Sequence, residues 1–72
     1  MNFKTQISAI KSYLKTTNVV KINEVFCGSF LGVKNSVVTV NVRHKSGAVS
    51  QLAFLVETTP EGNNHVIMEV DN

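Results

Sequence analysis

The chain has 72 residues, of which 43% are hydrophobic and 17% charged, and its formal net charge is +2 at pH 7. This composition fits one small domain, residues 1–72, and excludes a disordered chain and a second domain. The single cysteine excludes an internal disulfide. Because no signal-peptide core and no run of about 20 apolar residues is present, we expect a cytoplasmic protein.

The first segment has the apolar spacing of an amphipathic helix. Its apolar residues follow one another at steps of four, three and four, which places them on one stripe of a helix. The stripe consists of Phe3, Ile7, Ile10 and Leu14. The spacing predicts a helix over residues 3–15, with Asn2 as its N-cap and its end near Thr16.

Residues 19–33 form a less regular strand. Glu24 and Gly28 interrupt its apolar face, and a run of small residues at 27–29 predicts a bulge or bend there. We expect the return turn at residues 33–36.

The rest of the chain alternates apolar and polar residues as strands do. Nine apolar residues at even positions form the expected core face, namely Val38, Val40, Val42, Leu52, Phe54, Val56, Val66, Met68 and Val70. Placing Val40 opposite Leu52 leaves a three-residue hairpin loop at 45–47, with Gly47 at positive φ. The predicted fold is therefore α+β, an N-terminal helix packed on a four-stranded antiparallel meander in the order α-β-β-β-β.

The residues that could carry chemistry form no recognisable catalytic, cofactor or metal site. Cys27 with His44 or His65 could in principle make a thiolate and base pair, but a lone cysteine inside a strand is usually a small apolar residue. No spacing typical of a zinc site occurs. We therefore expect no enzyme activity, cofactor or metal.

The basic residues permit a nucleic-acid-binding surface. Residues 1–45 carry a net charge of +6 and residues 46–72 carry −4, although folding is expected to interleave the two halves and cancel most of the field. The candidate phosphate contacts are Lys4, Lys11, Lys15, Lys21, Lys34, Arg43 and Lys45. Lysines beside an apolar stripe also commonly cover the edge of a core, and the chain has no tryptophan for stacking on bases.

The odd-numbered face of the sheet is largely neutral and partly apolar. Its candidate protein interface consists of Val37, Val49, Leu55 and Ile67, with Leu55 expected opposite both Val37 and Ile67. Such a patch is either a set of unremarkable surface residues, a surface covered by the irregular strand, or an interface.

The preferred hypothesis is a small non-catalytic protein-binding module, self-associating as a homodimer and acting as a regulator or inhibitor through its sheet face. The alternative is a small nucleic-acid-binding protein. The excess of Asn, Lys and Ile over Arg is typical of AT-rich genomes such as those of many phages, which suggests a viral accessory protein. The protein partner itself is not identified by the sequence, and no membrane partner is expected.

Overall fold

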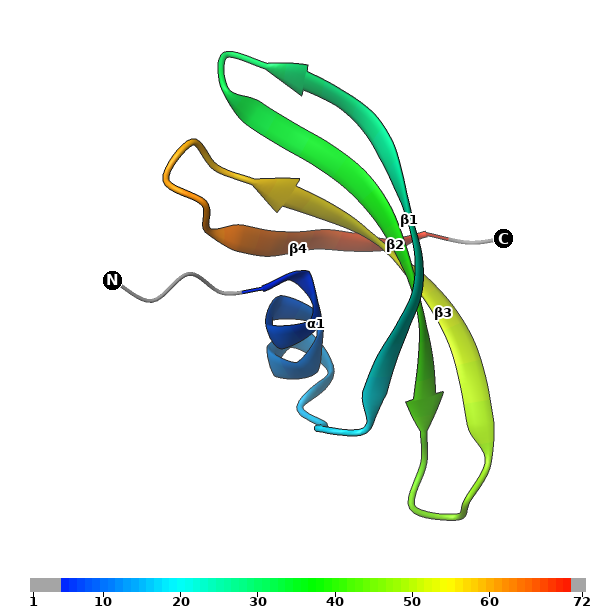
Figure 1. Ribbon diagram of the computed structural model, residues 1–72. Coiled ribbons are helices and arrows are strands. Elements are labelled where there is room, and N and C mark those ends of the chain that lie inside the picture. Colours follow the sequence, from blue (N-terminus) through cyan, green and yellow to red (C-terminus); the bar gives the residue numbers. More distant parts are fainter. Residues whose placement is uncertain (1–4, 71–72) are drawn as a thin grey trace.

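The computed structural model describes residues 5–70, which form one helix on one face of a twisted four-stranded sheet (Figure 1). The helix α1 spans Gln6–Leu14, and the strands are β1 (Val19–Phe30), β2 (Val33–Arg43), β3 (Val49–Thr58) and β4 (Asn64–Val70). The strand order is β1-β2-β3-β4, with antiparallel neighbours throughout. The predicted α-β-β-β-β arrangement is confirmed. We call the covered side of the sheet the helix face and the opposite side the outer face.

The helix α1 begins later than the sequence predicted. Thr5 is the N-cap, and its hydroxyl oxygen accepts a hydrogen bond from the Ser8 backbone N–H at 3.0 Å. This side-chain cap satisfies a backbone donor that the first helical turn leaves free. The predicted cap Asn2 and the apolar Phe3 lie outside the described residues.

The core lies between α1 and the two central strands. Ile10 of α1 and four sheet residues have no exposed surface, and these four are Val38, Val40, Phe54 and Val56. Val19 and Val42 extend this cluster, and partly buried residues pack around it, namely Ile7, Leu14, Leu52 and Val66. The described part of the predicted apolar stripe therefore faces the predicted side of the sheet.

The hairpin between β2 and β3 has the predicted register. Val38 lies opposite Phe54, and Val40 lies opposite Leu52. The His44 backbone N–H donates to the Ala48 carbonyl at 2.8 Å, which closes the loop of residues 45–47. Gly47 has φ 91°, as the loop length requires.

The predicted core face is wrong for the second half of β4, because that strand contains a bulge. Val56 lies opposite Val66, as expected, but Leu55 lies opposite Met68, so that Ile67 is an extra residue. An extra residue exchanges the faces of all residues after it, because strand side chains alternate. Met68 is therefore 52% exposed and shares the outer face with Leu55, and Val70, opposite Ala53, follows it there.

Two further bulges shape β1. The register with β2 shifts at Ile22 and again at Cys27. The second lies in the segment where a bulge was predicted, whereas the first was not predicted.

The turn between β1 and β2 also differs from the prediction. It consists of Leu31 and Gly32, with φ 52° and 82°, and residues 33–36 belong to β2. Two residues with positive φ match the twist of a tight hairpin, but leucine is uncommon in this conformation, so composition did not indicate the turn.

Candidate functional site

An exposed row of apolar side chains crosses the outer face from one sheet edge to the other. Successive register pairs join Val25 to Val37, Val37 to Leu55, and Leu55 to Met68. Residues opposite one another in a ladder share a face, so these four side chains form one line, which we call the apolar row. Its outer members Val25 and Met68 are 54% and 52% exposed, and its inner members are half-buried.

The apolar row contains two of the four predicted interface residues. Val37 and Leu55 are at its centre, but Ile67 is the bulge residue of β4, so the expected pair of Leu55 with Ile67 does not form. Val49 is exposed and lies opposite Arg43 at the end of the sheet, apart from the row.

Sequence reasoning missed Val25 and Met68. Both follow a bulge, which exchanges the faces of a strand without leaving a mark in the alternation pattern. For Val25, the available signal was the turn at residues 31 and 32 together with the bulge at Cys27, since both are needed to set Val25 opposite Val37.

Small and polar groups flank the apolar row. On its side toward Arg43, the next pair is Thr39 with Ala53, which are half-buried and buried. Beyond this pair is a hollow of about 390 Å³ lined by Asn18, Val20, Asn41, Arg43 and Val49. On the other side the next pair is Asn35 with Glu57, so the outer face carries a cation near one end and a carboxylate near the other.

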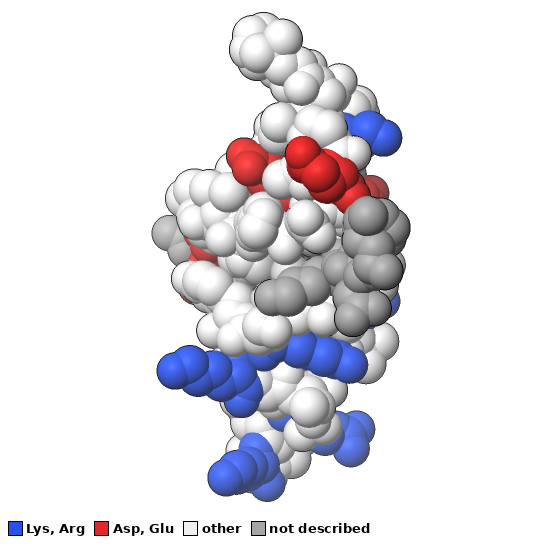
Figure 2. All heavy atoms as spheres, turned by 90° about the vertical axis from the view of Figure 1, so that its left-hand side faces the viewer, with Lys and Arg blue, Asp and Glu red and all other residues white. Residues whose placement is uncertain are grey.

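A second candidate site lies at the end of the molecule where α1 ends and β2 meets β3. It is a cavity of about 650 Å³ lined by Lys11, Ser12, Lys15, Thr16, Thr17, Asn18, Arg43, His44 and Lys45. We call it the basic cleft. Figure 2 views the molecule from the left-hand side of Figure 1. On the face it shows, most of the Lys and Arg side chains gather at the end that holds the basic cleft, and the Asp and Glu side chains lie nearer the opposite end.

Backbone hydrogen bonds hold the two walls of the basic cleft together. The Arg43 N–H donates to the Asn18 carbonyl at 3.0 Å, which ties the segment after α1 to the end of β2. The Thr16 N–H donates to the Lys11 carbonyl at 3.1 Å and closes the helix end, where Lys15 adopts a left-handed conformation with φ 56°. Such a closure satisfies helix carbonyls that would otherwise lack donors.

The structure brings together four of the seven predicted phosphate contacts. Lys11, Lys15, Arg43 and Lys45 line the basic cleft. Lys34 is nine residues from Arg43 along β2, about 30 Å at the usual strand rise. Lys21 is paired with an acid, and Lys4 lies outside the described residues. The expected charge cancellation is therefore local: it occurs at Lys21 and not in the basic cleft, where the described residues place no acidic side chain in the lining.

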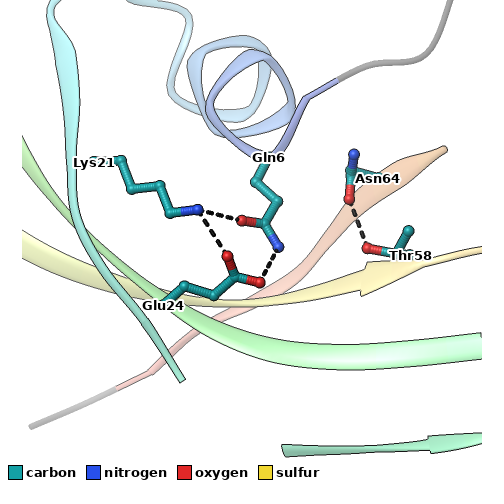
Figure 3. Close-up of polar contacts among 5 residues, drawn as sticks. All are labelled: Gln6, Lys21, Glu24, Thr58 and Asn64. Atoms are coloured by element: carbon teal, nitrogen blue, oxygen red, sulfur yellow. Dashed lines mark hydrogen bonds and ion pairs between the residues drawn. The ribbon is translucent and has the colours of Figure 1, made fainter. Parts of the chain in front are cut away.

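A polar cluster links the start of α1 to β1 (Figure 3). Lys21 Nζ lies 2.7 Å from Glu24 Oε1 and donates to Gln6 Oε1 at 3.0 Å, while Gln6 Nε2 donates to Glu24 Oε2 at 2.8 Å. Residues three apart normally point to opposite faces of a strand, and the bulge at Ile22 puts Lys21 and Glu24 on the same face. The hydrogen bond from Lys21, followed by that from Gln6, lowers the pKa of the Glu24 carboxyl.

The histidines do not lie beside the cysteine. Cys27 is exposed in the bulge between Phe26 and Gly28. His44 follows the far end of β2, and its Nε2 lies 2.7 Å from Ser50 Oγ, while His65 lies three strands away on β4. Three strand spacings are about 14 Å, too far for a thiolate and base pair.

Within residues 5–70, no group of three or more His, Cys, Asp or Glu side chains is placed to hold a metal ion. The helix of this part of the chain is too short to cross a membrane. Comparisons with family models, with curated proteins and with solved structures found no match.

Proposed function

We propose that this protein is a non-catalytic protein-binding module that forms a homodimer through its outer face and regulates or inhibits a protein partner by occupying its surface. The observation that carries the proposal is the apolar row, which spans all four strands and is uncovered in the described residues. Contiguous apolar surface of this kind is typical of interaction sites.

A second copy of the chain is the occupant that best fits the outer face. A two-fold axis parallel to the strands, midway between β2 and β3, lays β2 of each copy over β3 of the other. Leu55 of each copy then lies over Val37 of the other and Met68 over Val25, so that the apolar row packs against itself, and the small Ala53 allows close approach. The same operation places Arg43 over Val49 and Glu57 over Asn35, so no two charges of like sign from these pairs meet.

The substitution Leu55→Lys tests this proposal. It puts an ammonium group at the centre of an apolar contact without a partner charge, so we expect a folded monomer in sedimentation analysis. Leu31→Lys is the matched control, because Leu31 is 82% exposed in a turn outside the apolar row. A wild type that is monomeric at high concentration, or a Leu55→Lys variant that still dimerises, would refute self-association through this face.

Binding of nucleic acid is a second candidate function, favoured by the four cations in the basic cleft. The two candidate functions predict opposite effects of the same substitutions. The double substitution Lys11→Glu with Lys15→Glu should remove nucleic-acid binding, whereas Leu55→Lys should leave it intact.

A further inference from the structure

The basic cleft has the lining of an anion site built from two separate parts of the chain. Lys11 and Lys15 come from the end of α1, and Arg43 and Lys45 come from the end of β2 and its hairpin loop. None of the four forms an ion pair with an acid in residues 5–70. Four cations around one cavity repel one another, and a polyanion would relieve that repulsion.

Neutral donors complete the lining. Ser12, Thr16, Thr17 and Asn18 also face the cavity. Hydroxyl and amide groups beside Lys and Arg are the usual partners of phosphate oxygens. We infer that the basic cleft binds a ligand that carries two or more neighbouring phosphate groups, an inference that deepens the nucleic-acid candidate and does not depend on dimerisation.

Lys15 keeps a positively charged side chain at a position whose backbone conformation favours glycine. Its φ of 56° is left-handed, at a helix end where glycine is the common residue. A lysine there costs backbone strain, and strain of this kind tends to persist at functional positions. In the basic cleft, this lysine adds positive charge that glycine would not supply.

The lining favours phosphates over bases as the bound groups. Among residues 5–70, the His44 imidazole is the one aromatic ring that lines the basic cleft, so this part of the chain offers little surface for stacking. The end of α1 carries partial negative charge, which opposes a single weak anion. Several cations acting on adjacent phosphates outweigh the repulsion from the partial negative charge at the end of α1. A nucleic-acid backbone and a short polyphosphate both provide this chemistry.

Direct binding measurements with two probes test the inference. Inorganic tripolyphosphate and a labelled single-stranded oligonucleotide are titrated into the protein between about 50 and 200 mM salt. If all four cations contact phosphates of the single strand, the logarithm of its affinity should fall with the logarithm of salt with a slope of about −3. Arg43→Gln with Lys45→Gln should roughly halve that slope and weaken binding about tenfold or more at the lowest salt.

Lys15→Gly separates a binding role from a structural one. Glycine suits the left-handed conformation, so the thermal midpoint should rise while binding weakens. Lys34→Gln is the matched control, since it removes one exposed cation about 30 Å away and should leave binding unchanged.

The outcomes separate the phosphate site from the nucleic-acid function. Binding of tripolyphosphate alone, lost in the Arg43 and Lys45 variant, supports the site and rejects nucleic acid as the ligand. Binding of both probes with the same loss supports both. Absence of binding by either probe at low salt, or an equal loss in Lys34→Gln, overturns the inference.

Discussion

At the scale of single residues, Gly47 and Gly28 differ in what they require of the backbone. Gly47 has φ 91°, whereas Gly28 has no positive φ, and a Cβ at either position would meet no atom within 4 Å. Any cost of a side chain at Gly47 therefore comes from the backbone and not from packing. Gly47→Val should lower the free energy of unfolding by more than about 1 kcal/mol, because a β-branched residue is disfavoured in the left-handed region.

Gly28→Val is the control for that substitution. Valine suits a strand, so its denaturation midpoint should stay at or above that of the wild type. Equal midpoints for Gly47→Val and the wild type would contradict the assigned role of Gly47. The conformation of Gly47 was predictable from the sequence because turn chemistry and strand alternation agree there. Leu31 was not predictable, because an aliphatic residue gives no local signal for positive φ.

At the scale of elements, the packing of α1 on the helix face depends most on Ile10. Its side chain has no exposed surface, and it contacts the cluster formed by the central strands. Ile10→Ala should lower the free energy of unfolding by roughly 2 to 5 kcal/mol, since it removes buried methyl groups and leaves a cavity.

Ile22→Ala is the matched control for Ile10→Ala. Ile22 is 48% exposed in the first bulge of β1, so we expect a loss well below that of the buried site. Chemical denaturation of both variants gives the comparison. Equal losses would show that α1 contributes little to the core.

The polar cluster of α1 and β1 makes stability depend on acid. The pKa of Glu24 is lower in the folded protein, so its ion pair stabilises the fold at neutral pH and loses that effect as the pH falls through the folded pKa, below 4.5. The pair is about one third exposed, and its contribution should be at most about 1 kcal/mol. Side-chain NMR titration should show the Glu24 midpoint rising toward its ordinary value in Lys21→Gln, and an unchanged midpoint would contradict the pairing.

The regular and bulged elements explain why only part of the sheet was predictable. The ladder of β2 with β3 has no bulge, so alternation gave its register and its buried face correctly. Each outer ladder contains at least one bulge, and alternation cannot locate an extra residue. The helix start was missed for a local reason, since Asn2 and Thr5 are both good N-caps and the sequence does not choose between them.

At the scale of the whole molecule, the proposed dimer depends on the apolar row packing against the same row of the second copy. Met68→Lys should weaken dimerisation, because it places an ammonium group over Val25 of the second copy. Adding Val25→Glu should restore part of it, because each lysine then lies over a carboxylate of the other copy. Sedimentation equilibrium of the single and double variants checks this, and a double variant weaker than both singles would reject the proposed two-fold arrangement.

The basic cleft was predictable only in part. Helical spacing placed Lys11 and Lys15 on one edge of α1, because residues four apart share a side of a helix. Their approach to Arg43 and Lys45 depends on the short connection after α1 and on its hydrogen bond to β2. No local pattern describes a contact of that kind, so the sequence could name the cations without showing which of them meet.

The irregular edge strands also limit the kind of assembly that this chain can form. Both borders of the sheet, β1 and β4, contain bulges, and β1 carries several exposed apolar side chains, namely Val20, Ile22, Val25, Phe26 and Phe30. A straight apolar border of this length would invite unlimited addition of strands from other chains, as in fibrils. Bulges displace the free N–H and C=O groups from the regular spacing that such growth needs. Bulges at both borders therefore oppose open-ended addition of strands, and the proposed dimer, which uses the outer face, leaves these borders unchanged.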